Sequence, residues 1–316
     1  MRKLSVVIPA YNEEDNVSAA CSEVGKILSD NQIDYEIIFV DDGSGDLTWE
    51  RLTQLCTKDA NVKALRFSRN FGKEAAIFAG LKESVGDAVI VMDCDLQHPP
   101  ETIIKMYNIW ANNDIDIVEA RKSSRGKESL LYKFFARVFY GILKFASGMD
   151  LNGASDFKLL DRKVVDALNE MPERLTFFRA LSSWVGFRSE YVYFDVAKRK
   201  NGKTKWSFMK LARLAVSSVT SFSNFPMHII TGCGLLFFFF SVIMGINTLY
   251  NYLSGKALEG FSTVILLILI TGSIIMLGLG IIGYYLSKIY EEIKYRPRFI
   301  ISERTSKKED SGRESC

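Results

Sequence analysis

The sequence predicts an α/β protein in which a mostly parallel sheet carries helices on both faces and is followed by two membrane-spanning helices. Strand-like and helix-like segments alternate along the first part of the 316-residue chain, which is the pattern of a parallel sheet. The run Ala88–Met92 is apolar throughout, as expected for a strand that is buried on both faces. Residues 229–287, in contrast, are almost free of charge.

The first part of the chain is expected to contain four strands, each followed by a polar turn. In chain order these strands are Leu4–Ile8, Tyr35–Val40, Val62–Phe67 and Ala88–Met92. Pro9 ends the first strand, and Pro99-Pro100 stops any continuation of the fourth. Helices are expected at about 16–28, 49–56 and 74–84. In the first of them, apolar residues recur at helical spacing.

The elements that follow Pro100 are expected to extend the same domain. They are a helix at 101–111, a strand at Ile115–Ala120, a helix at Lys163–Glu170 and a strand at Phe187–Val196, where the residues alternate. Residues 130–145 are basic and strongly aromatic. A helix of that composition suits the membrane interface, and a helix packed on the sheet is the alternative. Residues 208–219 form a further amphipathic stretch.

Two segments, Ile229–Leu249 and Phe261–Leu286, are each long enough to cross roughly 30 Å of hydrocarbon as helices. Glycines give the second segment a small-residue face for helix packing. A buried core hairpin is the alternative. Lysine and arginine crowd before the first segment and after the second, so we expect both termini to be cytoplasmic. The residues from about Ser302 are polar, and we expect them to be disordered.

The composition narrows the classes of function. A formal net charge of +3 is too small to indicate a nucleic-acid partner. The five cysteines are scattered and lack the spacing of a metal site, which favours a reducing compartment. Strand-like residues open the sequence with no apolar signal segment before them, so we expect the soluble part to stay where it is made.

Asp93 and Asp95 follow directly on the buried strand Ala88–Met92. Two carboxylates this close repel each other unless a cation lies between them or one pKa is raised. Oxygen ligands suit Mg²⁺ or Mn²⁺, and such ions usually bridge to substrate phosphates. The alternative is a pair of solvated loop carboxylates.

Polar residues follow all four of the first strands. They are Tyr11, Glu13, Asp41, Asp42, Arg69, Lys73, Asp93 and Asp95. Open parallel sheets bind their ligands beyond the carboxyl ends of the strands, so we expect one site there. The sequence has neither Gly-x-Gly-x-x-Gly after the first strand nor Gly-x-x-x-x-Gly-Lys-Ser/Thr, which argues against a dinucleotide cofactor and an NTPase-type phosphate loop.

Four motifs, in this order and at this spacing, resemble those of the family 2 glycosyltransferases of the GT-A fold. They are Val7–Glu14, Val40–Ser44, Arg69–Lys73 and Met92–Pro100. Within that family the chain is similar to the polyprenyl-phosphate branch, which includes bactoprenol glucosyltransferases and dolichyl-phosphate mannosyltransferases with two C-terminal spans. The resemblance covers about residues 3–290 and does not specify the sugar.

The resemblance implies an inverting transfer of a sugar from a nucleotide-sugar to polyprenyl phosphate, for modification of cell-envelope glycans. UDP-glucose is the first expectation for the donor, and UDP-N-acetylglucosamine and GDP-mannose remain open. A non-catalytic nucleotide-sugar-binding membrane protein is a more distant alternative. A processive polysaccharide synthase would carry more spans and a Gln-x-x-Arg-Trp segment, which the sequence lacks.

The resemblance also implies a role for each candidate residue. The nucleotide-sugar is assigned to Pro9, Tyr11, Glu13, Asp41, Asp42, Lys73 and Asp93. A bound Mg²⁺ or Mn²⁺ is assigned to Asp95, Gln97 and Asp93. Catalysis is assigned to Asp156, Asp93 and Arg121, and the acceptor phosphate to Lys122, Arg199, Lys203 and Lys205. Asp156 is a base or an orienter of other groups, because a phosphate monoester is already mostly dianionic at pH 7.

In these terms the chain divides into five parts. They are a cytoplasmic GT-A catalytic domain (1–197), a basic interfacial segment with an amphipathic helix (198–227), transmembrane helices at 228–252 and 261–287, and a cytoplasmic tail (288–316). The resemblance places the protein in the cytoplasmic membrane, with the bilayer, the nucleotide-sugar and polyprenyl phosphate as partners. A homo-oligomer and a downstream flippase or transferase are further candidate partners.

Overall fold

The computed structural model describes residues 2–122, 155–171, 177–194, 225–254 and 260–305. The chain forms two compact units. One unit comprises residues 1–140, 149–206 and 296–316, and the other comprises residues 141–148 and 207–295. The basic aromatic segment at 130–145 and the amphipathic stretch at 208–219 lie outside the described residues.

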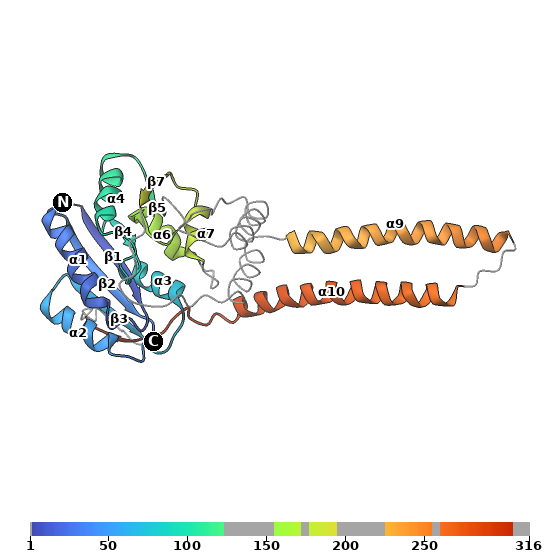
Figure 1. The fold of residues 1–316 in the computed structure, drawn as a ribbon, viewed down its shortest axis with the longest axis horizontal. Coiled ribbons are helices and arrows are strands. Elements are labelled where there is room, and N and C mark those ends of the chain that lie inside the picture. The colour runs from blue at the N-terminus through green and yellow to red at the C-terminus, as the bar shows by residue number, and fades with distance from the viewer. Residues whose placement is uncertain (1, 123–154, 172–176, 195–224, 255–259, 306–316) are drawn as a thin grey trace, which may run out of the picture. The chain divides into compact units, whose positions relative to one another are not determined.

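The first unit is built on a mixed sheet whose described strands follow the order β7-β5-β6-β4-β1-β2-β3-β8 (Figure 1). Their bounds are β1 (Lys3–Ala10), β2 (Asp34–Asp41), β3 (Val62–Phe67), β4 (Ala88–Val91), β5 (Ile117–Lys122), β6 (Lys158–Asp161), β7 (Ser189–Phe194) and β8 (Ile301–Arg304). β1 pairs in parallel with β2 and β4, and β2 pairs in parallel with β3. β6 and β8 run antiparallel to their neighbours. The expected mostly parallel sheet is therefore confirmed.

Helices cover both faces of this sheet. α1 (Val17–Asp30), α2 (Thr48–Lys58) and α4 (Glu101–Asn112) share one core with alternate residues of β1, such as Val6 and Ile8. α3 (Lys73–Glu83) packs on the opposite face, against Val7. This contact requires glycine at position 80 of α3, since an added Cβ would lie 2.2 Å from Val7 Cγ1. α6 (Arg162–Glu170) and α7 (Phe178–Trp184) follow later in the chain.

The central strand β4 fits its sequence. All of its residues are completely buried, as expected for an apolar run with helices above and below the sheet. Full burial of one such side chain stabilises the fold by roughly 1.5–3 kcal/mol. The end of β4 is therefore a rigid platform for the polar turn that follows it.

Sequence patterns did not predict β6, α7 or β8. β8 corrects one expectation, because residues from about Ser302 were expected to be disordered. Instead, Ser302 Oγ donates to the Arg66 carbonyl at 3.1 Å, and Thr305 N donates to the Ala64 carbonyl at 3.0 Å. The physical reason is the edge of β3, whose N–H and C=O groups pair with any suitable extended segment.

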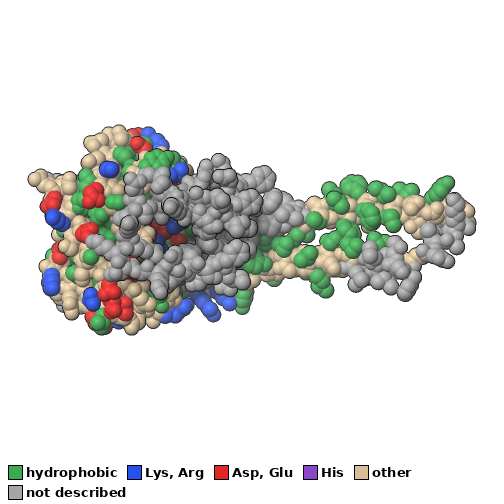
Figure 2. Space-filling view, viewed as in Figure 1, with side chains coloured by type: hydrophobic (Ala, Val, Ile, Leu, Met, Phe, Trp, Pro, Cys, Tyr) green, Lys and Arg blue, Asp and Glu red, His purple; other side chains and the backbone are tan. Residues whose placement is uncertain are grey.

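The second unit contains α9 (Phe225–Leu253) and α10 (Phe261–Ile293). Within them, Ile230–Asn251 and Ile270–Ile293 are long and apolar enough to cross a membrane. Large hydrophobic side chains lie exposed along both helices, which argues against a buried core hairpin (Figure 2). The helices pack together where an added Cβ at Gly278 would lie 3.4 Å from Ile230 Cγ2.

Candidate functional site

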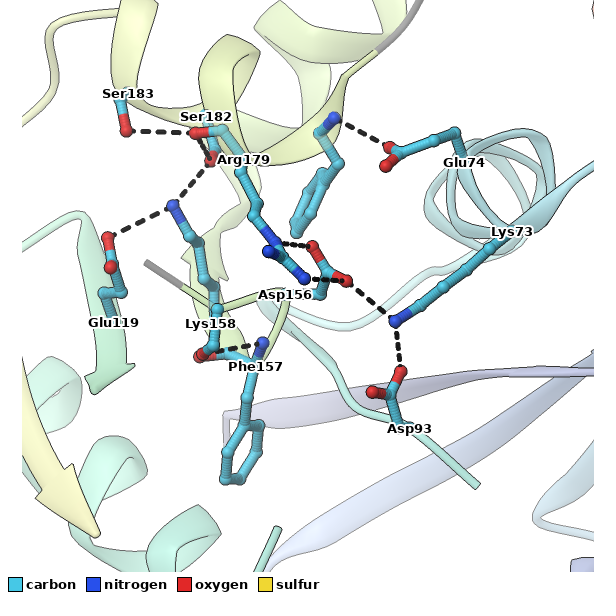
Figure 3. A network of polar contacts seen from close by, with 12 residues as sticks. Lys73, Glu74, Asp93, Glu119, Asp156, Phe157, Lys158, Arg179, Ser182 and Ser183 are labelled. Atoms are coloured by element: carbon cyan, nitrogen blue, oxygen red, sulfur yellow. Dashed lines mark hydrogen bonds and ion pairs between the residues drawn. The ribbon is translucent and has the colours of Figure 1, made fainter. Parts of the chain in front are cut away.

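The strand directions bring two acidic segments to one edge of the sheet. β4 ends just before Asp93, and β6 begins just after Asp156. Because β6 runs antiparallel to β4, with Lys158 opposite Val91, the residue before β6 arrives at the carboxyl end of β4. The sequence separation of these carboxylates is large, yet the sheet places them across a short gap (Figure 3).

Lys73 fills that gap. It is the first residue of α3, and its Nζ contacts Asp93 Oδ1 and lies 2.7 Å from Asp156 Oδ2. Burial lowers the pKa of Lys73, but the two neighbouring carboxylates outweigh this effect and raise it. Lys73 therefore stays charged and connects the Asp93 carboxylate to that of Asp156.

Asp156 has a second cationic partner, Arg179 of α7. Arg179 Nε lies 2.6 Å from Asp156 Oδ1, and Nη2 lies 3.0 Å from Oδ2. Burial raises the pKa of Asp156, yet Lys73 and Arg179 together hold that pKa well below its ordinary value. A carboxylate that binds protons this weakly is a poor general base, which favours the role of an orienter.

A second polar chain links β5 to the same region. Arg121 Nε lies 3.2 Å from Glu119 Oε1, and the Arg121 guanidinium carbon lies 3.7 Å from the centre of the Tyr191 ring. Glu119 Oε2 in turn lies 3.1 Å from Nζ of the buried Lys158, which donates to Ser182 Oγ at 2.9 Å. Arg121 is thus held in a fixed orientation on β5.

Asp41, at the end of β2, is buried, and one of its carboxylate oxygens accepts a hydrogen bond. Its Oδ1 accepts a hydrogen bond from Ser44 N at 2.9 Å. Its Oδ2 lies 3.4 Å from Arg66 Nε but accepts no hydrogen bond from the described residues. Burial raises the pKa of Asp41. An acceptor held in this way can bind an N–H or O–H group of a ligand.

Asp42, the next residue, is engaged by the backbone. Its carboxylate accepts from Phe71 N at 2.6 Å and from Gly72 N at 2.9 Å. These bonds fix the loop before Lys73, where Gly72 adopts a φ of 100° that favours glycine. Asp42 therefore positions the loop that carries Lys73.

The residues after β1 lie at the same edge as Asp41. Pro9 is within β1, and the Tyr11 side chain that follows is 47% exposed, which leaves it accessible to a ligand. Glu13 N donates to Thr48 Oγ1 at 3.0 Å, and Glu13 Oε2 accepts from Asn16 Nδ2 at 2.5 Å. The first of these bonds connects the loop after β1 to the start of α2.

The turn after β4 presents Asp95 and Gln97. Gln97 N donates to Asp95 Oδ1 at 3.2 Å, and both side chains are half-buried. Between them Leu96 has a φ of 53°, a strained conformation of the kind found at functional turns. The buried His98 ring supports the turn, because it stacks on Phe157 with 4.7 Å between ring centres and Nδ1 accepts from Asp93 N at 3.4 Å.

Residues 5–167 match the family model of glycosyl transferase family 2. The chain belongs to this family. It is 37% identical over 303 residues to an uncharacterized glycosyltransferase of Synechocystis, with 95% of each chain covered. It is 37% identical over 301 residues to the prophage bactoprenol glucosyl transferase homolog of Escherichia coli, covering 95% of this chain and 98% of the relative. It is 36% identical over 310 residues to the bactoprenol glucosyl transferase of Shigella phage SfV, covering 96% and 100%.

Among solved structures, the glycosyltransferase is similar to glucosyl-3-phosphoglycerate synthase from Mycobacterium tuberculosis, crystallised with Mn²⁺, UDP-glucose and phosphoglyceric acid. The TM-score is 0.48 at 19% identity, with 70% of this chain and 79% of that chain covered. Family membership, rather than this likeness, confirms the expected fold class and makes the chain an enzyme, a glycosyltransferase. The non-catalytic alternative is therefore set aside.

Of the residues that the sequence singled out, the structure brings three into contact: Asp93, Lys73 and Asp156. Asp41 ends β2, and Tyr11 follows the neighbouring strand β1. Arg199, Lys203 and Lys205 lie outside the described residues of the glycosyltransferase. Lys122 ends β5, but its side chain is not among those described.

Three residues of the polar network were missed by sequence reasoning: Arg179, Lys158 and Glu119. Lys158 offered one signal, because it stands only two residues after the candidate Asp156. Arg179 offered none, since the segment around it carries no motif and its contact with Asp156 spans 23 residues. Such partners of the glycosyltransferase site become visible only in three dimensions.

Proposed function

We propose that this glycosyltransferase moves one glucose residue from UDP-glucose onto polyprenyl phosphate. The observation that carries the proposal is the contact of Lys73 with both Asp93 and Asp156, at the sheet edge where ligands of such folds bind. Two relatives that match along nearly their whole length are named for glucosyl transfer involving bactoprenol, a polyprenyl lipid. The two apolar helices α9 and α10 suit an enzyme whose acceptor has a long lipid tail.

In the proposed reaction, a phosphate oxygen of the acceptor attacks the anomeric carbon of glucose. The bond from that carbon to the diphosphate oxygen breaks, UDP leaves with the electron pair, and the configuration inverts. The acceptor phosphate is mostly dianionic at pH 7, so no proton has to be removed before attack. Asp156 then acts by holding Lys73 and Arg179 in place.

We assign the donor to residues at this edge of the sheet. Pro9, Tyr11 and Glu13 would line the base and ribose, and Asp41 Oδ2, which accepts no hydrogen bond from the described residues, would accept one from the nucleoside. Asp42 would contribute through the loop that carries Lys73. Asp93 would lie by the ribose and the sugar, and Lys73 would face the donor phosphates.

The turn after β4 fits a divalent cation. Asp95 and Gln97 present oxygen donors on a half-exposed turn, the ligand type that Mg²⁺ and Mn²⁺ prefer. In the described part of the chain, no group of three or more His, Cys, Asp or Glu side chains could hold a metal. This suits an ion that also takes ligands from phosphates and water, with Asp93 close by. When bound, the ion would neutralise charge on the departing diphosphate.

The acceptor side rests on basic residues near the expected membrane surface. Arg121 is oriented by Glu119 and Tyr191, and it would face the reacting phosphates. Lys122, Arg199, Lys203 and Lys205 would bind the acceptor phosphate. We place the catalytic domain and both termini on the cytoplasmic side of the cytoplasmic membrane, where the donor is available. A homo-oligomer and a downstream flippase or transferase remain proposed partners.

The proposal is tested by supplying the full-length protein in detergent with a short polyprenyl phosphate and one labelled donor at a time. UDP-glucose is expected to label the organic phase, and UDP-N-acetylglucosamine and GDP-mannose are the competing donors. Chelation of divalent cations, or Asp95→Ala, should remove both transfer and metal-dependent binding of UDP without loss of folding. Asp114→Ala is the control, because it removes an exposed carboxylate that pairs with Arg188 and not with a residue of the turn after β4. Label that stays in the aqueous phase for all three donors would contradict the proposal.

A further inference from the structure

Arg179 binds the Asp156 carboxylate through two hydrogen bonds. It is the second residue of α7, and its Nε and Nη2 lie 2.6 and 3.0 Å from the two oxygens of Asp156. Lys73 Nζ shares Oδ2 at 2.7 Å, so that one carboxylate serves two cations. Two parallel hydrogen bonds fix the plane of a guanidinium group far better than a single ion pair does.

The three charged side chains of this cluster differ in their access to solvent. Asp156 is 4% exposed, whereas Arg179 is 35% exposed and Lys73 is 40% exposed. The Asp156 carboxylate therefore forms the buried base of the cluster, and Lys73 and Arg179 are its accessible cations, with the Asp93 carboxylate beside Lys73 exposed to 34%. An anion that enters the site would reach these cations and not the Asp156 carboxylate.

The charged side chains next to this cluster have partners of their own. Asp93 contacts Lys73 on the side away from Asp156. Lys158 is buried and paired with Glu119. Glu74 faces α7, where its carboxyl group accepts from Phe178 N at 2.7 Å.

We propose that Arg179, together with Lys73, binds a phosphate oxygen of the reacting substrates, and that Asp156 positions both cations for this task. The inference deepens the proposed function and rests on it. The phosphate belongs either to the diphosphate of the donor or to the monoester of the acceptor. Both present the charged oxygens that a fixed guanidinium group recognises.

The test compares Arg179→Gln with Arg162→Gln, a matched control. Arg162 begins α6, is of similar exposure at 29%, and donates to the Gly86 carbonyl at 2.9 Å, so its loss should affect folding and not substrates. Calorimetry would measure the affinity of each full-length variant for UDP and for uridine, which lacks the phosphates. Steady-state kinetics would give the Michaelis constant for a short polyprenyl phosphate.

If the phosphate belongs to the donor, Arg179→Gln should weaken the binding of UDP by about tenfold or more, as expected for loss of charge-assisted hydrogen bonds. The affinity for uridine should be unchanged. If it is the acceptor's, UDP affinity should be unchanged and the Michaelis constant for polyprenyl phosphate should rise by a similar factor. If Arg179→Gln and Arg162→Gln have the same affinity for UDP and the same Michaelis constant for polyprenyl phosphate, the inference is overturned.

Arg179→Lys keeps the test decisive if the glutamine variant does not fold. It retains the charge but loses the paired hydrogen bonds to Asp156, so it should show a smaller loss on the same substrate. A lysine variant with the parent's affinities in both assays would overturn the role of the guanidinium group. If the parent protein transfers no sugar but Arg179→Gln still weakens UDP relative to uridine, the proposed function fails while the phosphate site stands.

Discussion

At the scale of single residues, Glu74 shows how the cluster around Asp156 affects its surroundings. Burial and the nearby Asp156 carboxylate raise the pKa of Glu74 from 4.5 to about 7. The folded state thus holds a proton that the unfolded state releases near pH 4.5. Stability falls as the pH rises from 4.5 towards 7, and Glu74 contributes no further change once both states are ionised.

Glu74→Gln should remove this loss of stability at rising pH. Glutamine keeps an oxygen that can accept from Phe178 N but carries no charge. Between pH 5.5 and 8 the parent should lose about 2 kcal/mol of stability that the variant retains. The melting temperature of full-length protein in detergent, measured at both pH values, checks the difference. Parallel pH profiles for the parent and the variant would show that Glu74 does not titrate in this range.

The site residues that sequence reasoning found all lie in short motifs after strands. Asp93 and Asp95 stood out because a buried strand leads directly into them. Lys73 and Asp156 were assigned through the resemblance, but their contact could not be predicted. It depends on β6 running antiparallel beside β4, which no local pattern specifies.

At the scale of elements, the strands and helices of the first 122 residues were predicted within about two residues, because each has a clear period and a clear stop. β6 was missed since Lys158–Asp161 is too short to show alternation. β8 was missed because its residues are mostly polar, and the edge of β3 decides its conformation. Short elements of this kind are fixed by their neighbours rather than by their own composition.

The C-terminal segment should contribute measurably to the stability of the first unit. Phe299 stacks on Phe67 with 5.1 Å between ring centres and an interplanar angle of 11°. Phe299→Ala should therefore lower the free energy of unfolding by about 1–2 kcal/mol, with little effect on UDP affinity. Ile300→Ala is the control, since that side chain is 51% exposed. Equal melting temperatures for the two variants would contradict a stabilising role for this stacking contact.

At the scale of the whole molecule, the chain joins a family 2 catalytic unit to a pair of long apolar helices. The helices leave the first unit in sequence after β7, and the chain contributes β8 to the sheet after α10. The two apolar runs were predictable, because a long uncharged run in an otherwise polar chain is typical of a membrane-spanning helix. The end of α10 was not, since the helix continues to Ile293, beyond the expected end at 287.

The packing of α9 against α10 gives a prediction for the second unit. An added Cβ at Gly278 would already lie 3.4 Å from Ile230, so a branched side chain there should separate the helices. Gly278→Ile should lower the melting temperature in detergent, corresponding to a loss of about 1–3 kcal/mol from overpacking. Gly280→Ile, on the same helix, has open space around the added Cβ and should be tolerated. A reversal of this order would contradict the packing.

We propose a single inverting transfer of one sugar to a lipid phosphate. The mass and the anomeric configuration of the lipid formed from UDP-glucose and a short polyprenyl phosphate test this proposal. We expect one product, with one hexose on the phosphate and a configuration opposite to that of the donor. A ladder of products with several hexoses, retention of configuration, or a sugar attached anywhere but the phosphate would contradict it.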